Sequence, residues 1–490
     1  MPQNATPRQL DPVLLALAAI AALTLYRIGL LALSDADLFV DEAQYWVWGQ
    51  NLDWGYYSKP PMIGWVLRAV TELAGSDAPF WIRLPGPVFH AATALILIGV
   101  ARRLTDPVAA ALVGLTYVSL PAVAMGSFLI STDTILLPFF AGAVWCYLIL
   151  TDRPSFAHAV GLGVCIGLGF LSKYAAIYAV LCLGLGALTL PQARISLRDV
   201  AVAVVAGLLV ISPNIIWNLQ NDLMTVSHTA DNVDWVKQES LLAGLNLQGA
   251  VDFLAAQFGV FGPVLFAAYI LAVLRARPGR FANPWHKAWL VWLSVPILAL
   301  VTVQALLSKA FANWAVTAAV GLVLLTVPVL WHRFRAVFWS ALAVNVALCL
   351  ALPIAATQTT SWARDDGRLV LRRFTGRTAT SERVIADVQA QGLTEIVASH
   401  RHLLADLFHT AKGTGLQIYA VPPQGHPQHY YAQRKAYPQG MTRPFALVTT
   451  DGAPLPCVPK TQPFAEWTAG PGAFRDNRVR LYQLPPDCWD

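Results

Sequence analysis

Charged residues are scarce in this chain. Asp, Glu, Lys and Arg make up only 13% of the 490 residues, whereas 56% are hydrophobic, and the mean hydropathy is +0.52. Soluble domains carry roughly 25% charged residues, so the composition excludes an ordinary soluble protein and indicates an integral membrane protein. The net charge of +6 comes from arginines spread over short loops, so we expect no nucleic-acid partner.

Several functional signatures are absent as well. The sequence has no Gly-rich nucleotide-binding loop, no serine-hydrolase motif and no His/Cys/carboxylate spacing that demands a structural metal. Internal repeats, which are typical of many transporters, are not visible either. The apolar run 12–33 is too long for a signal-peptide core and lacks a clear cleavage site, so we expect it to be a retained first helix.

Apolar segments of membrane-spanning length recur from residue 12 to residue 355. About 20 residues are needed to cross about 30 Å of hydrocarbon, and on that basis we predict about eleven spans. They lie at 12–34, 79–101, 107–126, 133–151, 156–172, 174–190, 199–217, 251–274, 286–307, 311–331 and 336–356.

The charges of the loops predict the topology. Arg8 precedes the first span, and basic residues recur in alternate loops, at 102–103, 153, 194–198, 275–287 and 333–335. The positive-inside rule places these loops and the N-terminus in the cytoplasm. The opposite loops, 35–78 and 218–250, are long and rich in Asp and Glu. An odd number of spans then places the C-terminal part outside the cytoplasm.

After Thr357 the composition becomes polar, and the pattern predicts a small soluble α/β domain. We expect helices at 381–391 and 402–412 and strands at 395–399, 416–421, 444–450 and 479–484. Cys457 and Cys488 lie in this domain, and an oxidising compartment favours a disulfide between them. The other cysteines lie in apolar spans, where we expect them to act as small packing residues: Cys146, Cys165, Cys182 and Cys349.

The first outer loop contains the densest set of candidate functional residues. Asp41 and Glu42 follow the first span, and aromatic residues, Lys59 and a Pro-Pro break come next. Carboxylates also stabilise helix N-termini, and aromatic residues also form interfacial belts without other function. A carboxylate beside lipid is nevertheless costly unless it is solvated, paired or used. The combination favours a site where a lipid-borne anionic substrate binds and an acid deprotonates the acceptor.

Other polar residues fall at the outer ends of distant spans. Asp133 either caps its helix, a role that Ser131 or Thr132 could also fill, or assists Asp41. Three lone lysines are predicted at the same face, and ammonium groups that converge would bind a phosphate as point charges. These are Lys59, Lys173 and Lys309. His228, in the second outer loop, is either an acceptor contact or a metal ligand, although a lone loop histidine is more often neither.

Five segments resemble the integral membrane GT-C glycosyltransferases. The nearest groups are the protein O-mannosyltransferase-like enzymes and the bacterial transferases that put aminoarabinose or galacturonic acid on lipid A. The matching segments are D-E-A-Q-Y-W and L-D-W-G-Y-Y-S-K-P-P within 41–61, S-T-D at 131–133, G-F-L-S-K-Y at 169–174, P-N-I-I-W-N at 213–218 and S-K with A-N-W within 308–314.

The resemblance implies an all-α membrane fold. We expect a GT-C bundle of about 11–13 transmembrane helices, amphipathic outer-face helices and a C-terminal soluble α/β domain. Residues 1–356 would form the catalytic domain and 357–490 the periplasmic domain. The protein would be a multi-pass protein of the bacterial inner membrane, with a cytoplasmic N-terminus. Its partners would be membrane lipids, a polyprenyl-phosphate-sugar donor and a lipid or glycan acceptor.

The resemblance also implies roles for the site residues. Asp41 matches the family's catalytic aspartate and Asp133 its second acid, with Glu42 beside them. The three lysines named above would bind the donor phosphate. Sugar and acceptor contacts would come from Tyr45, Trp54, Tyr56, Tyr57 and His228.

Two departures from the family pattern bear on whether the site could bind a metal ion. The aminoarabinose-type enzymes carry Glu before the phosphate-binding lysine and Arg shortly after the first aspartate, and this chain has Ser58 and Gln44 there. We therefore assign no metal ligand, and a divalent cation stays an open alternative. The rival hypotheses are a transporter or flippase for polyprenyl-linked glycans and a polymerase or ligase that uses a diphosphate-linked donor.

Overall fold

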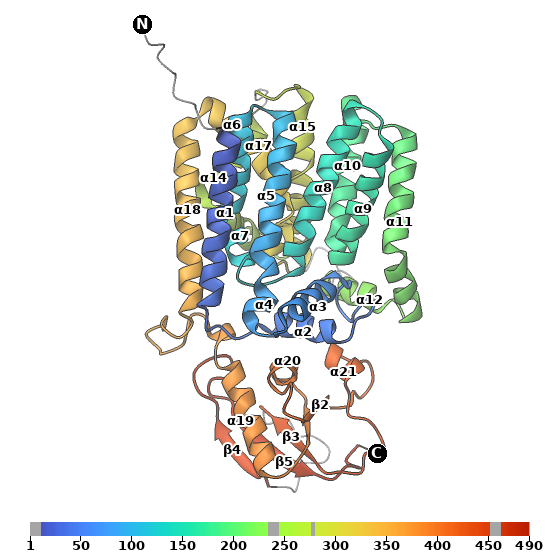
Figure 1. The fold of residues 1–490 in the computed structure, drawn as a ribbon, viewed down its shortest axis with the longest axis vertical. Coiled ribbons are helices and arrows are strands. Elements are labelled where there is room, and N and C mark those ends of the chain that lie inside the picture. The colour runs from blue at the N-terminus through green and yellow to red at the C-terminus, as the bar shows by residue number, and fades with distance from the viewer. Residues whose placement is uncertain (1–10, 234–244, 276–279, 451–461, 490) are drawn as a thin grey trace. The chain divides into compact units, whose positions relative to one another are not determined.

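The computed structural model describes residues 11–233, 245–275, 280–450 and 462–489. The chain divides into two compact units, whose elements are labelled in Figure 1. The helical unit comprises Met1–Leu31 and Arg83–Pro353, and the mixed unit comprises Ala32–Ile82 and Ile354–Asp490. Residues 35–78, the predicted first outer loop, thus pack with the C-terminal residues. The predicted division into a catalytic domain, 1–356, and a periplasmic domain, 357–490, stays a prediction.

The helical unit is built from α-helices joined by short turns. Its elements are α1 (Pro12–Ala32), α5 (Pro85–Leu104), α6 (Pro107–Val118), α7 (Pro121–Gly126), α8 (Thr132–Asp152), α9 (Phe156–Ser172), η1 (Tyr174–Ala176), α10 (Ile177–Thr189), η2 (Pro191–Ala193), α11 (Leu197–Gln220), α12 (Met224–Val233), α13 (Leu247–Phe261), α14 (Pro263–Leu274), α15 (Trp285–Trp292), α16 (Val295–Leu307), η4 (Ala312–Ala315), α17 (Ala318–Arg333) and α18 (Arg335–Thr357). Helix α4 (Pro79–Arg83) begins in the mixed unit and ends at the residue where the helical unit resumes.

The apolar helices confirm a multi-span protein. Among the described residues, six helices are long and apolar enough to cross a membrane, or seven if α13 and α14 form one bent span. Four shorter apolar helices, α6, α9, α17 and the segment of η1 with α10, accompany them. Every predicted span falls on these helices, but several of the spans are interrupted. The span 79–101 is interrupted at Leu84, the span 286–307 at Leu293 and Ser294, and the span 311–331 at Val316 and Thr317. The span 107–126 is interrupted at Ser119 and Leu120, and the span 251–274 is interrupted at Gly262.

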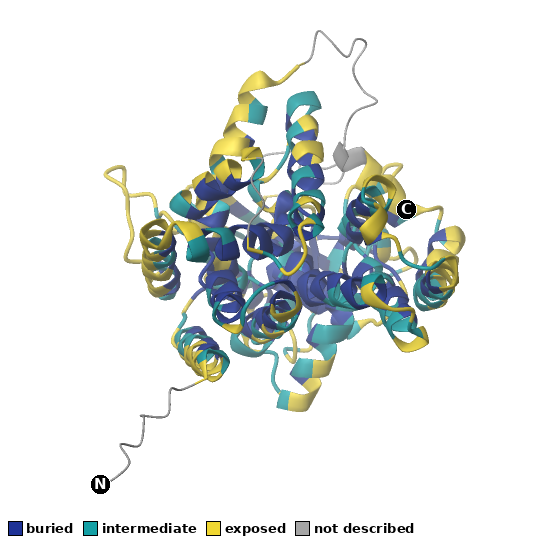
Figure 2. Ribbon diagram, turned by 90° about the horizontal axis from the view of Figure 1, so that it is seen from above, coloured by how far each residue is buried: buried dark blue, intermediate teal, exposed yellow. Residues whose placement is uncertain are grey.

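The outer helices carry apolar side chains on their exposed faces. Leu25 on α1, Leu209 on α11 and Trp339 on α18 are all more than half exposed. In Figure 2, exposed residues lie on the outward faces of the helices and buried residues on the faces that turn toward neighbouring helices. Exposed apolar surface of this extent marks contact with lipid in a chain of this composition.

A glycine-lined contact joins α9 and α11. A Cβ atom added to Gly163 would lie 2.2 Å from the carbonyl oxygen of Ala203, and one added to Gly167 would lie 2.7 Å from Cβ of Val210. The two glycines are four residues apart and share one face of α9. Small residues at this spacing let two membrane helices approach closely, where van der Waals contacts stabilise the pair.

Helices α13 and α14 meet at a bend of 113°. Gly262 connects them with φ +92°, a backbone conformation that residues with a Cβ atom rarely adopt. The side chain of Asn345, buried on α18, donates through Nδ2 to the carbonyl of Phe261 at 3.1 Å. Because lipid offers no hydrogen bonds, this amide supplies one that the broken helix has lost.

The bend predicts a selective effect of substitution. Gly262→Ala would place Cβ 1.7 Å from Oδ1 of Asn345 and force alanine into the left-handed region, so we expect the protein to lose at least about 1–3 kcal/mol of unfolding free energy. Gly259→Ala on α13, where a Cβ meets nothing within 4 Å, should be neutral or stabilising. Unfolding in mixed micelles, followed by tryptophan fluorescence, measures both, and equal stability of the two variants would contradict this account.

The mixed unit combines two helices of the first outer loop with a five-stranded sheet. The helices are α2 (Val40–Gln50) and α3 (Met62–Ala74), and the sheet has the order β2-β1-β3-β5-β4. Strands β1 (Glu395–Ala398), β2 (Gln417–Ala420) and β3 (Phe445–Thr449) run parallel, while β5 (Arg478–Leu484) and β4 (Ala465–Thr468) add in antiparallel fashion. The remaining elements are η5 (Arg372–Phe374), α19 (Arg377–Ala390), α20 (Arg401–Thr410) and α21 (Tyr430–Arg434).

The predicted elements of the C-terminal part are confirmed within a few residues, and the predicted α/β class with them. The sequence prediction missed β4 and α21, which have only 4 and 5 residues. Such short elements bury too few side chains to show a period. Cys488 is disulfide-bonded. Its predicted partner, Cys457, lies outside the described residues, so the pairing stays a prediction.

Candidate functional site

An ion pair lies at one end of the helical unit. Nζ of Lys173 is 2.7 Å from Oδ1 of Asp133, and their side chains are only 17% and 9% exposed. Oδ2 of Asp133 accepts a hydrogen bond of 3.0 Å from Nδ2 of Asn313. Three of the segments that carry the family resemblance therefore meet at one carboxylate.

The local sequence explains this geometry. Ser131 caps α8 by accepting the N–H of Thr134, so Asp133, one position inside the first turn, is not needed as the cap. Helix α9 packs against α8, and Lys173 is the residue that directly follows the end of α9 at Ser172. The helix-capping alternative for Asp133 is thus wrong, because Ser131 performs that role and the carboxylate faces Lys173.

A second polar network begins at the residue after Lys173. The hydroxyl of Tyr174 donates to Oδ1 of Asn214 at 2.9 Å and accepts from Nδ2 of Asn218 at 3.1 Å. Both asparagines are buried and lie near the end of α11. The network ties the turn after α9 to α11 and holds the backbone beside Lys173 in one conformation. In the sequence, these asparagines stood out only as part of the family-related segment 213–218.

Lys309 and His228 lie elsewhere in the helical unit. Lys309 is exposed, and its carbonyl accepts from Nε2 of Gln304 at 3.1 Å. It precedes η4, the turn that carries Asn313 to Asp133. His228 is half-buried in α12. Phosphate binding by Lys309 and acceptor contact by His228 stay predictions.

A double-mutant cycle tests the buried pair. We expect Asp133→Asn and Lys173→Gln to show a coupling of about 1–3 kcal/mol in unfolding free energy, because each single change leaves a poorly solvated charge. The matched control is the exposed pair Arg103–Asp152, whose coupling should stay below about 1 kcal/mol. Both cycles are measured by unfolding in mixed micelles. Additive effects at Asp133 and Lys173 would show that the contact does not stabilise the fold.

In the mixed unit, Asp41 and Glu42 have different surroundings. Glu42 is fully buried, and its Oε2 accepts the N–H of Phe39 at the start of α2, at 2.9 Å. This bond satisfies a backbone donor of the first turn. Asp41 is 45% exposed. The structure thus gives Glu42 a structural contact and presents Asp41 outward, and a catalytic role for either stays a prediction.

An arginine of the C-terminal part binds Asp41. Nη2 of Arg401 donates to Oδ1 of Asp41 at 2.5 Å, and its Nε donates to Oε1 of Gln44 at 2.9 Å. Arg401 is the first residue of α20. Sequence reasoning missed it, because an arginine after a short strand of a soluble domain carries no catalytic pattern.

The aromatic candidates divide between interior and surface. Tyr56 is buried, stacks on Trp48 with centroids 4.7 Å apart and donates its hydroxyl to the Trp48 carbonyl at 2.9 Å. Tyr45 is also buried and contacts the same ring. Trp54 is half exposed, and the hydroxyl of Tyr57 donates to the carbonyl of Pro427 at 3.0 Å. A sugar or acceptor contact by any of these four residues stays a prediction.

Lys59 is half-buried, and its carbonyl accepts the N–H of Tyr56 at 3.1 Å. The residue therefore lies on the turn that also positions the Tyr56 ring. Its predicted proximity to Lys173 would join two units, so that convergence stays a prediction. Asp41 and Asp133 also lie in different units, so their predicted proximity stays a prediction as well.

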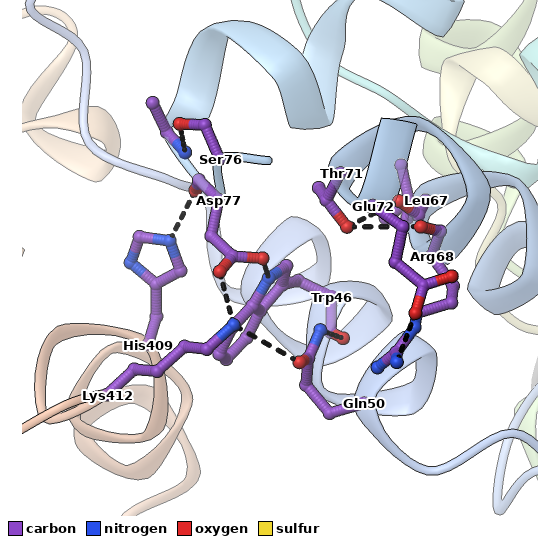
Figure 3. A network of polar contacts seen from close by, with 11 residues as sticks. Trp46, Gln50, Leu67, Arg68, Thr71, Glu72, Ser76, Asp77, His409 and Lys412 are labelled. Carbon is purple, nitrogen blue, oxygen red and sulfur yellow. Dashed lines mark hydrogen bonds and ion pairs between the residues drawn. The ribbon is translucent and has the colours of Figure 1, made fainter. Parts of the chain in front are cut away.

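A polar network on the mixed unit centres on Asp77 (Figure 3). Its carboxylate accepts from Nε1 of Trp46 at 2.8 Å and pairs with Lys412, while its carbonyl contacts Nε2 of His409 at 2.9 Å. Burial acts to raise the pKa of Asp77, but the hydrogen bonds from Lys412 and Trp46 outweigh it and lower the pKa. The network ties the end of α20 to the first outer loop.

The lowered pKa of Asp77 predicts a pH-dependent stability. A carboxylate with a lowered pKa in the folded state contributes stability that is present above its unfolded pKa, about 4, and is lost as the pH falls through the folded value. We expect wild type to be more stable than Asp77→Asn from pH 7 to about pH 5, with the gap closing below about pH 4. Melting curves across this range measure the gap. A gap that widens with acid would contradict the assignment.

Comparisons with known proteins identify the family. Residues 58–217 match the family described as dolichyl-phosphate-mannose-protein mannosyltransferase. Over 473 residues, the chain is 41% identical to the lipid A galacturonosyltransferase RgtD of Rhizobium johnstonii, covering 96% of this chain and 98% of that protein. The chain belongs to the GT-C family of membrane glycosyltransferases.

The fold of this glycosyltransferase is also found in solved structures. ArnT from Cupriavidus metallidurans in the apo state matches with a TM-score of 0.64 and 15% identity, over 97% of this chain and 98% of that chain. The same protein bound to undecaprenyl phosphate matches with a TM-score of 0.62 and 16% identity, over 96% and 97%. These structures confirm the predicted fold class.

These comparisons confirm the prediction that the protein is a glycosyltransferase, and they do not support the rival prediction of a transporter without transferase chemistry.

Where the structure describes side chains, it holds no group of three or more His, Cys, Asp or Glu residues arranged to hold a metal ion.

Proposed function

We propose that this glycosyltransferase moves a monosaccharide from a polyprenyl-phosphate donor to lipid A at the periplasmic face of the bacterial inner membrane. The observation that carries the proposal is the 41% identity, over nearly the whole of both chains, to a protein named for galacturonosyl transfer to lipid A. Galacturonic acid is therefore the first donor sugar to test. The undecaprenyl phosphate bound to ArnT, a protein of the same fold, supports the donor class.

Asp41 is the proposed general base. Its exposed carboxylate would accept the proton of an acceptor hydroxyl, whose oxygen then attacks the anomeric carbon of the donor sugar. The bond between that carbon and the phosphate oxygen breaks, and the polyprenyl phosphate leaves with the electron pair. Attack from the face opposite the phosphate inverts the anomeric configuration.

The lysines would stabilise the departing phosphate. An ammonium group has three donors, so Lys173 can pair with Asp133 and still offer hydrogen bonds to a phosphate. Asn313 and Asp133 would fix its position before the substrate arrives, and preorganised charge of this kind is often the largest electrostatic contribution to catalysis. Lys59 and Lys309 are proposed as further phosphate contacts, with Asp133 as the second acid.

The loop charges support the orientation. Arginine-bearing loops and the N-terminus would face the cytoplasm, and the mixed unit, which contains Asp41, would face the periplasm. In that orientation the donor reaches the site laterally from the outer leaflet, and the acceptor is a component of the envelope.

Asp41→Asn tests the assignment of the base. We expect kcat to fall about 10²–10⁴-fold, the range for loss of a positioned general base, while the melting temperature changes little because the side chain is part exposed. The assay uses purified protein, polyprenyl-phosphate galacturonic acid and lipid A, with mass spectrometry of the product. Glu72→Gln, which changes an exposed side chain on α3 of the same loop, is the matched control and should keep wild-type activity.

The same assay separates the rivals. Product formed only from a polyprenyl diphosphate donor would favour a ligase-type enzyme, and product on another envelope glycan or a protein but not on lipid A would overturn the acceptor. Full activity of Asp41→Asn would remove the proposed base. Mass spectrometry of lipid A from cells with and without the gene checks the acceptor in vivo.

A further inference from the structure

Asp41 is held from outside its own helix. Among the described residues, its side-chain partner is Arg401, 360 residues later in the sequence, which donates to Oδ1. Within the described part of the chain, Oδ2 accepts no side-chain hydrogen bond. One oxygen of the carboxylate is therefore fixed and the other is left for a ligand.

The guanidinium of Arg401 is itself fixed at two points. Nη2 reaches Asp41 and Nε reaches Gln44, which lie three positions apart and so share one face of α2. Gln44 is buried, with 2% of its surface exposed. A planar guanidinium held at two donors has one orientation, which a flexible ammonium would not have.

Arg401 also comes from a rigid element. Leu403, Leu404 and Leu407 of α20 are fully buried, and the helix packs on α2, α19 and β2. At its other end, His409 and the nearby Lys412 contact Asp77 (Figure 3). The helix is thus joined to the first outer loop at both ends, and a residue at its start has a defined position.

We propose that Arg401 is a positioning residue for the reaction, which holds Asp41 so that Oδ2 faces the acceptor proton. The C-terminal part of the chain therefore completes the active site rather than only covering it. This inference rests on the proposed function of Asp41. A displacement of about 1 Å in a reacting group can cost about 10²-fold in rate, so the contact has a measurable kinetic effect.

The test measures kcat and KM for Arg401→Gln, Arg401→Lys and Gln44→Met in the full-length protein, with the polyprenyl-phosphate sugar and lipid A. We expect Arg401→Gln to lower kcat about 10–10²-fold, with KM for the donor within about 2-fold, the pattern for an interaction that orients the reacting group. Arg401→Lys should recover part of the rate, because an ammonium can reach Asp41 but cannot also hold Gln44. Gln44→Met should give an intermediate loss.

Two further variants separate positioning from general damage. Lys412→Gln removes a contact of the other end of α20 with the same loop and should keep kcat within about 3-fold of wild type. In the Asp41→Asn background, Arg401→Gln should change the residual rate by less than about 2-fold, because a residue that acts through Asp41 has nothing left to orient. A merely structural role would lower the rate in both backgrounds.

The outcomes distinguish this inference from the proposed function. Wild-type kcat in Arg401→Gln, with Asp41→Asn inactive, would overturn the role of Arg401 and leave the base in place. A higher kcat in Arg401→Gln would show that the ion pair inhibits, which also overturns it. Full activity of Asp41→Asn would overturn the proposed function itself, whatever Arg401→Gln does.

Discussion

A charge beside lipid must be satisfied by another part of the protein, and this constraint shapes the polar structure of the whole chain. With so few charged residues, partners come from distant positions. Asp133 finds Lys173 and Asn313, which follow it by 40 and 180 residues. Arg27, buried in α1, donates to the carbonyl of Val118 at the end of α6. Each contact satisfies a polar group that would otherwise be costly in the apolar surroundings, and each also fixes the packing of the helices that meet there.

The sequence predicted what depends on length, composition and local period. Apolar runs showed where helices lie, because about 30 Å of hydrocarbon requires about 20 residues. Most helices and strands of the C-terminal part were predicted from the hydrophobic period and from glycines that end the helices. Asp133 and Lys173 were predicted at the same face from loop charges, and they do form a pair. Their family-related motifs were equally visible in the sequence.

What escaped prediction depends on contacts between distant residues. At the bend beside Gly262, Asn345, 83 positions later, donates a hydrogen bond to the broken helix, and nothing in the sequence around Asn345 predicts this contact. The stack of Tyr56 on Trp48, which buries its ring, was not visible in the sequence, and its predicted ligand contact stays a prediction. Arg401 gave no signal, since only the packing of α20 on α2 brings it to Asp41. The first outer loop likewise packs with residues that follow it by more than 300 positions.

That long separation has a consequence for biosynthesis. Residues 35–77 are translated long before their partners at 359–427. The hydroxyl of Tyr57, for example, donates to the carbonyl of a residue that is made 370 positions later. At about 5–20 residues per second, the interval is roughly 20–70 s. During that time the loop carries tryptophans and carboxylates without the sheet and helices that cover them. This loop therefore completes its fold only after the C-terminal residues have been made, and a chain released early from the ribosome would lack Arg401, the partner of Asp41.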